Sequence, residues 1–157
     1  QEMIIKLSEY LRYSLSNKEQ KITTLKTEIE NIQLYLEIEK IRFGDRLNFN
    51  FDCPEEVLAA QIPAMILQPL FENAIKHGVY ESVDTIEVIF KGELVEDNLQ
   101  LSLINDFDPA AKKTKGEGIG LKNSRERLFL IYKKNDLLKL SKSENKFTID
   151  LKIPQND

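Results

Sequence analysis

The segment ENAIKHG gathers side chains that could bind a metal ion and a phosphate. Asn73, Lys76 and His77 follow a spacing of three and four residues, which places them on one face of a helix. The amide oxygen of Asn73 and the carboxylate of Glu72 are hard ligands suited to Mg²⁺, and Lys76 could meet a phosphate. The same residues also fit an ordinary helix end, because Lys and His complement the C-terminal dipole and Gly78 can supply a left-handed terminus. The segment alone leaves both interpretations open.

A second segment, KGEGIGLKNSRERL, has glycines at every second position directly before an amphipathic, arginine-rich helix. These are Gly116, Gly118 and Gly120, and such a backbone offers N–H donors at a helix N-terminus to an anion. The spacing is not that of a dinucleotide-binding fingerprint, because a polar loop separates the glycines from the preceding strand. The chain also lacks the Gly-Lys-Ser/Thr of a P-loop. A flexible hinge into the helix is the alternative interpretation.

Two helices are predicted ahead of these segments. Residues 3–15 predict an amphipathic helix whose apolar stripe consists of Ile4, Leu7, Leu11 and Leu15. A second helix starts at a Thr24 cap, ends at Gly44 and is apolar on two sides. Those two sides could face a hairpin partner and either another subunit or the following domain, although a helix within one globular core fits equally well.

Beyond Gly44 the hydrophobic period changes to two, which is typical of strands. Strands are predicted at residues 47–51, 85–94, 98–106, 137–143 and 146–154. A helix is predicted from Pro63 to Gly78, with Pro69 resetting it so that residues 70–77 form the productive part. Another helix is predicted at 121–134. Strands grouped without regular β-α-β alternation favour an α+β fold in which helices cover one face of a mixed or antiparallel sheet.

Composition narrows the class of protein. With 157 residues, 41% hydrophobic and 31% charged, the chain predicts a soluble globular domain with a helical appendage rather than a disordered segment. The net charge of -4 argues against a nucleic-acid surface, and the lone Cys53 excludes an internal disulfide. No apolar run approaches the roughly 18 to 20 residues of a membrane span. The chain opens inside a helical pattern, so we expect it to be a piece of a longer protein.

The order of these segments resembles a known superfamily. It looks like the order of the N, G1 and G2 boxes in the GHKL ATPases. Here an Asn-bearing helix is followed by a strand ending in LIND, a polar segment and then GEGIGL. Within that superfamily, the chain resembles the LytS/YehU-type sensor histidine kinases over essentially its whole length. The segments that carry this resemblance are SEYLRYSL, EIENIQLYLEIEKIRFGDRL, ILQPLFENAIKHG and GEGIGLKNSRERL. The resemblance implies a Bergerat-type two-layer α/β sandwich at residues 45–157. Residues 1–44 would be the C-terminal part of a helical dimerisation and phosphoacceptor region, without the acceptor histidine.

The resemblance also implies roles for individual residues. Glu72 and Asn73 would be catalytic, with Asn73 binding the Mg²⁺ that bridges the nucleotide phosphates and Glu72 orienting or activating the attacking group. Lys76 and His77 would face the phosphates, and residues 106–117 would act as a lid. The backbone that holds the phosphates would be that of Gly116, Gly118, Ile119, Gly120 and Leu121.

One position departs from the pattern of the family. Asn105 stands where the adenine-reading aspartate of the G1 box is expected, and the glycines usual in that box are missing. An Asn oxygen can accept from the adenine amino group, but without charge the hydrogen bond is weaker. Asp106 is the alternative reader of the base.

The function implied by the resemblance is that of the ATP-binding catalytic region of a bacterial two-component sensor histidine kinase. It would use ATP and Mg²⁺ to transfer the γ-phosphoryl group to a histidine upstream of this chain, and from there to a response regulator. His77 lies in the nucleotide-binding box, so it is not expected to be the phosphorylated residue. The full-length protein would be a homodimer with no nucleic-acid partner, and this region would be the cytoplasmic part of a membrane-anchored kinase, reaching the membrane only through upstream segments.

Two other functions remain open from the sequence. The atypical G1 box motivates a degenerate GHKL-fold module that no longer binds nucleotide and serves in interaction or dimerisation. A stand-alone ATPase of the chaperone or repair type is the third hypothesis, and the two helices before Gly44 argue against it.

Overall fold

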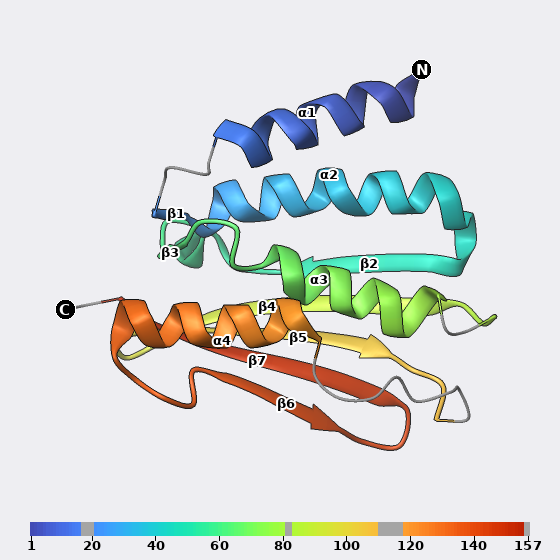
Figure 1. The fold of residues 1–157 in the computed structure, drawn as a ribbon. Coiled ribbons are helices and arrows are strands. Elements are labelled where there is room, and N and C mark those ends of the chain that lie inside the picture. Colours follow the sequence, from blue (N-terminus) through green and yellow to red (C-terminus); the bar gives the residue numbers. More distant parts are fainter. Residues whose placement is uncertain (17–20, 81–82, 110–117, 156–157) are drawn as a thin grey trace.

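A mixed five-stranded sheet forms one layer of the protein (Figure 1). The computed structural model describes residues 1–16, 21–80, 83–109 and 118–155. In spatial order the strands are β2 (Leu47–Asp52), β4 (Ile86–Val95), β5 (Asn98–Asp106), β7 (Lys146–Pro154) and β6 (Leu138–Lys142). Strand β2 pairs with β4 in parallel, and the other neighbours pair antiparallel. The predicted strands and the predicted mixed sheet are confirmed.

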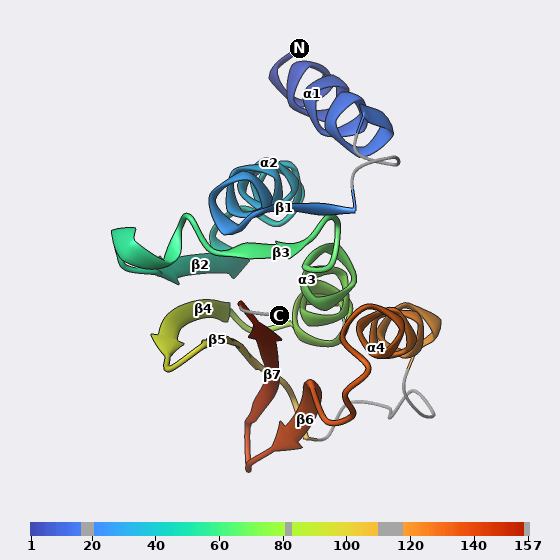
Figure 2. The same cartoon turned by 90° about the vertical axis from the view of Figure 1, so that its left-hand side faces the viewer.

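Helices cover one face of this sheet (Figure 2). They are α2 (Leu25–Phe43), α3 (Gln68–Ile75) and α4 (Ile119–Tyr132), while α1 (Glu2–Ser16) lies farther out and packs against α2. Two short strands, β1 (Ile22–Thr24) and β3 (Gln61–Pro63), pair antiparallel beside the start of α2. Single 3₁₀ turns occur at Gly44–Arg46 and Glu55–Val57. The predicted α+β class is therefore confirmed.

The alternation of side chains along the strands builds the core between the two layers. On β5, the residues that point toward the helices are buried, and all but Asn105 at the end of the row are apolar: Leu99, Leu101 and Leu103. Phe71 of α3 packs on Phe90 of β4 and Phe51 of β2, with ring centroids 5.4 Å and 5.9 Å apart. These contacts hold α3 against β2 and β4.

Helix α2 has the caps that its sequence predicts. The Thr24 hydroxyl accepts a hydrogen bond from the Thr27 N–H at 3.2 Å, and Gly44 ends the helix with φ 57°. Its buried apolar side chains belong to the same hydrophobic cluster as the sheet, and they are Leu25, Ile29, Ile32 and Leu36. The division of the chain at Gly44 stays a prediction. The apolar stripe of α1, unlike the apolar side chains of α2, is exposed to solvent.

Two predictions about the ends of α3 are wrong. Pro63 does not open the helix, because it ends β3, and α3 begins at Gln68. Pro69 therefore occupies the first turn, where its missing N–H has no carbonyl partner to lose. Gly78 is not a left-handed terminus, because the chain continues as a π-helix over Lys76–Tyr80 and only Gly44 among the described glycines has a positive φ.

Candidate functional site

Helix α3 and its π-helical extension form the spine of the candidate site, because close contacts at two glycines join them to α4 and β5. A Cβ atom on Gly120 of α4 would lie 3.3 Å from the Cβ of Pro69 in the first turn of α3. A Cβ atom on Gly78 would lie 3.3 Å from the Asp106 carbonyl oxygen and 3.5 Å from Asn105 Nδ2. The three segments singled out in the sequence are therefore brought together, with Asn73 between the two contacts.

Asn73 carries an amide oxygen without a hydrogen-bond partner. Its side chain is half-buried, and Oδ1 is shielded from solvent with no partner among the described residues. A buried acceptor left unpaired costs about 1 to 3 kcal/mol, so it needs a compensating role. An unpaired amide oxygen on the spine fits the ligand chemistry of Mg²⁺, which is typically held by one or two protein oxygens together with substrate phosphates.

Glu72 is exposed, and a second residue of α3 holds it in place. Gln68 Nε2 donates a hydrogen bond to Glu72 Oε1 at 3.0 Å, and Gln68 itself is only 7% exposed. Sequence reasoning missed Gln68, although the spacing of four residues that joins it to Glu72 is the signal that could have found it. Helix α1 also lies near this carboxylate: burial and, after it, the charge of Glu72 raise the pKa of Tyr10 to about 12.

Lys76 and His77 lie where the α-helix changes into the π-helix. The Lys76 N–H donates to the carbonyl oxygens of both Asn73 and Glu72. Lys76 is exposed and His77 is half-buried. The α-helical spacing that places both on the face of Asn73 ends at Ile75, so their orientation toward phosphates stays a prediction. Short π-helical segments occur frequently at functional sites, which keeps the segment a candidate.

Asn105 and Asp106 have different surroundings at the end of β5. Asn105 is fully buried; its Nδ2 donates to the Asp106 carbonyl oxygen at 2.9 Å, and its Oδ1 is buried with no partner among the described residues. Both carboxylate oxygens of Asp106 already accept hydrogen bonds, Oδ2 from the Glu87 N–H at 3.0 Å and Oδ1 from Lys146 Nζ. Of the two, Asn105 has the available acceptor.

At the start of α4, the glycines predicted to hold the phosphates differ in their surroundings. Gly118 caps the helix without a side-chain hydrogen bond, and a Cβ there would meet nothing within 4 Å. Gly120 lies inside the helix against Pro69, Ile119 is 79% exposed, and Leu121 is buried in the core. Gly116 and positions 110–117 of the predicted lid lie outside the described residues. Among the described residues, none would obstruct a ligand at Gly118 beside the first turn of α4.

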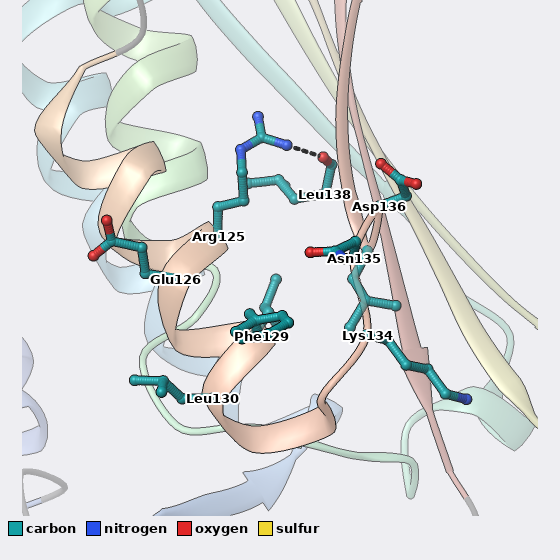
Figure 3. Close-up of a pocket in the computed structure, with 10 residues that line it drawn as sticks. Arg125, Glu126, Phe129, Leu130, Lys134, Asn135, Asp136 and Leu138 are labelled. Carbon is teal, nitrogen blue, oxygen red and sulfur yellow. Dashed lines mark hydrogen bonds between the residues drawn. The ribbon is translucent and has the colours of Figure 1, made fainter.

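A separate pocket lies at the other end of α4 (Figure 3). It has a volume of about 590 Å³ and is lined by α4 and the turn into β6. Arg125 donates a hydrogen bond to the Leu138 carbonyl oxygen, and the ring of Phe129 lies beside the hollow. None of the predicted site residues lines this pocket.

In the described part of the chain, no cluster of three or more His, Cys, Asp or Glu residues is arranged to hold a metal ion. No helix there meets the length and hydropathy of a membrane span.

Comparison with known proteins gives consistent matches. A histidine kinase family model matches residues 1–47. Sensor histidine kinase BtsS of Escherichia coli (strain K12) is 36% identical over 122 residues, which cover 78% of this chain and 22% of that protein. Sensor histidine kinase YpdA of the same organism is 36% identical over 141 residues, covering 83% and 25%. Sensor protein LytS of Oceanobacillus iheyensis is 25% identical over 166 residues, covering 97% and 28%.

Solved structures show the same fold. Histidine kinase AdeS of Acinetobacter baumannii matches with a TM-score of 0.66 at 15% identity, covering 98% of this chain and 77% of that chain. The catalytic domain of histidine kinase ThkA matches with a TM-score of 0.62 at 16% identity, covering 85% and 95%. The fold is that of a histidine kinase catalytic domain. The chain spans about a quarter of the length of the curated relatives it matches, and over most of its own length it is similar to the LytS/YehU-type sensor histidine kinases.

Proposed function

We propose that this chain binds ATP with Mg²⁺ as the catalytic region of a two-component sensor histidine kinase. The γ-phosphoryl group would pass to a histidine upstream of this chain and then to a response regulator. The observation that carries the proposal is the unpaired Asn73 Oδ1 on a spine whose two ends contact α4 and β5. In this proposal the Asn73 oxygen would bind the metal, between one end of the spine that would read the base and another that would hold the phosphates.

The base would bind at the Gly78 end of the spine. Asn105 Nδ2 is engaged by the Asp106 carbonyl, which leaves Oδ1 to accept from the adenine amino group. The amide is neutral, so this hydrogen bond contributes less than one to an aspartate would. The departure in the G1 box therefore retains the acceptor while removing its charge.

The phosphates would lie at the other end, beside Gly118 and the first turn of α4. The N–H groups of a first helical turn have no intrahelical carbonyl partner, and the helix dipole favours an anion there. Gly120 allows this turn to approach α3. Lys76 is exposed and lies near the Gly78 end, so its long side chain would have to reach along the spine to meet the phosphates. When bound, Mg²⁺ would neutralise the negative charge of the phosphates and orient them for transfer.

Glu72 would orient the attacking imidazole or accept its proton. Its carboxylate is exposed and held by Gln68, so it is available to an acceptor helix without losing its orientation. Holding a reacting group in position lowers the entropic part of the barrier. His77 would take part in nucleotide binding rather than carry the phosphoryl group.

We also propose the assembly that this function requires. The exposed stripe of α1 would be part of a homodimer interface in the longer protein. A response regulator would receive the phosphoryl group, and histidine kinase ThkA, which shares the fold, has been solved in complex with response regulator protein TrrA. Residues 1–44 would belong to the dimerisation region, and the whole would be the cytoplasmic part of a membrane-anchored bacterial kinase.

Calorimetric titration with a non-hydrolysable ATP analogue tests the proposal. We expect binding that depends on Mg²⁺ and weakens about a hundredfold in Asn73→Ala, equivalent to roughly 2.7 kcal/mol of lost binding free energy. Asn50→Ala is the control, because Asn50 is exposed on β2. Absence of binding by the wild type would instead favour the interaction module that the altered G1 box suggests.

A further inference from the structure

A buried carboxylate outside the candidate site joins three segments of the protein. Glu28 of α2 is 1% exposed. Its Oε1 accepts a hydrogen bond from the Tyr13 hydroxyl at 2.9 Å and another from the Met65 N–H at 2.8 Å. Tyr13 belongs to α1, and Met65 lies in the turn that leads into α3. One oxygen atom therefore connects the outer helix to the element that carries Glu72 and Asn73.

The turn at Met65 has a backbone conformation that its sequence does not favour. Met65 has φ 64°, and the turn is closed by the Ile66 N–H donating to the Pro63 carbonyl oxygen at 3.3 Å. A positive φ at the third residue of such a turn normally selects Gly or Asn. A methionine there costs about 1 to 2 kcal/mol, so the turn depends on contacts from outside it. The hydrogen bond from the Met65 N–H to Glu28 is such a contact.

A second helix holds the same turn from the opposite direction. Arg127 of α4 donates through Nη1 to the Ala64 carbonyl oxygen at 2.5 Å. Burial raises the pKa of the Glu28 carboxyl, and the hydrogen bonds from Met65 and Tyr13 together with the charge of Arg127 oppose that rise. The turn is thus fixed by α2 and by α4, the helix whose first turn forms the other half of the candidate site.

We propose that Glu28 is a positioning residue that sets the start of α3, and that its bond to Tyr13 makes the geometry of the nucleotide site depend on the position of α1. Tyr13 and Met65 donate to the same oxygen, so displacement of Tyr13 removes one of the contacts that fix the Glu28 carboxylate in the position where it meets Met65. The turn then relaxes toward a less strained conformation, and Glu72 and Asn73 move with the helix that follows it. The effect on nucleotide rests on the proposed function, whereas the effect on the turn does not.

Amide hydrogen exchange resolved by residue tests the coupling without any nucleotide. In Tyr13→Phe, which removes only the hydroxyl, we expect the Met65 amide and the amides of α3 to exchange about tenfold faster, while those of β5 remain as in the wild type. Ser8→Ala is the matched control, because it removes an α1 hydroxyl that donates to the Ile4 carbonyl within its own helix. Wild-type exchange at Met65 and α3 in Tyr13→Phe would overturn the proposal.

A second variant separates this coupling from ordinary packing. Met65→Gly removes the cost of the positive φ, so in that background Tyr13→Phe should change the exchange of α3 by less than about twofold. Equal effects in both backgrounds would refute the role of the strained turn. Titration with the ATP analogue then completes the test: Tyr13→Phe should weaken binding about three- to tenfold. A wild type that binds no nucleotide would reject the proposed function, while the exchange data would still decide on Glu28.

Discussion

Asn105 and Asp106 are adjacent on strand β5, yet their side chains lie on opposite faces of the sheet. Asn105 continues the buried row that faces the helices, whereas Asp106 lies on the other face, where it pairs with Lys146 of β7. Successive side chains of a strand alternate between faces, so only one of the two can share a side with α3. This relationship favours Asn105 as the reader of the base.

Paired substitutions distinguish these two residues. We expect Asn105→Ala to weaken the affinity for the ATP analogue about tenfold, because it removes a base-reading acceptor worth roughly 1.4 kcal/mol. Asp106→Asn should leave the affinity within about twofold and cost at most about 1 kcal/mol of unfolding free energy, since its ion pair is partly exposed. Calorimetric titration and urea unfolding measure both effects. A loss of affinity confined to Asp106→Asn would reverse the assignment.

Gly78 is required by its surroundings rather than by its backbone angles. A Cβ atom there would lie 3.0 Å from Ile86 Cγ2 and 3.3 Å from the Asp106 carbonyl oxygen. We expect Gly78→Ala to destabilise the protein by about 1 to 3 kcal/mol and to weaken nucleotide binding by displacing Asn105. Gly118→Ala is the matched comparison, because its Cβ would meet none of the described residues within 4 Å and its φ of −67° suits alanine. Thermal unfolding that ranks the two variants equally would contradict this interpretation.

The burial of Glu28 predicts a dependence of stability on pH. Its pKa in the folded protein is raised above the ordinary value of 4.5, chiefly by loss of hydration. The folded state therefore holds this proton to higher pH than the unfolded state, so the Glu28 contribution to the unfolding free energy falls as pH rises from about 4.5 through the folded pKa. Glu28→Gln does not titrate and should gain stability relative to the wild type across that interval.

Denaturant unfolding at a series of pH values measures that difference. Glu56→Gln, at an exposed position, reports the general effect of removing one negative charge. A difference between Glu28→Gln and the wild type that stays constant above pH 4.5 would show that the carboxyl is not perturbed in the folded state.

Gln68 should affect phosphoryl transfer more than nucleotide binding. Gln68→Met keeps a long side chain of similar size but loses the hydrogen bond to Glu72, so the carboxylate samples more rotamers. In the full-length kinase we expect the rate of histidine phosphorylation to fall about tenfold while the affinity for the ATP analogue is unchanged. Gln100→Met, on the outer face of β5, is the control. A loss of affinity without a loss of rate would contradict the positioning role.

Local patterns predicted the elements of the fold accurately. The alternating residues of β5 and β7 gave their full extents, and Thr24 and Gly44 marked the ends of α2, because these signals depend only on neighbouring residues. The same alternation could have separated Asn105 from Asp106. The ends of α3 were predicted wrongly, since Pro63 and Gly78 have structural roles set by segments distant in the sequence.

Residues that tie the site to the rest of the protein could not be found in this way. Glu28 bonds to Tyr13 and to Met65, at separations of 15 and 37 residues, and Arg127 reaches Ala64 across 63 residues. Nothing in their local sequence distinguishes them from solvent-exposed charges. The parallel pairing of β2 with β4 is likewise invisible to periodicity, because it depends on how the chain returns across the sheet.

The π-helix at Lys76–Tyr80 sets the angular position of the end of α3. An i to i+5 turn holds one residue more than an α-helical turn, so the residues after it are rotated relative to a continuous α-helix. Deleting one residue would restore the more favourable helix but would rotate Gly78 away from Asn105. The π-helical turn is less favourable than an α-helical one, but it keeps the end of the helix aligned with the sheet.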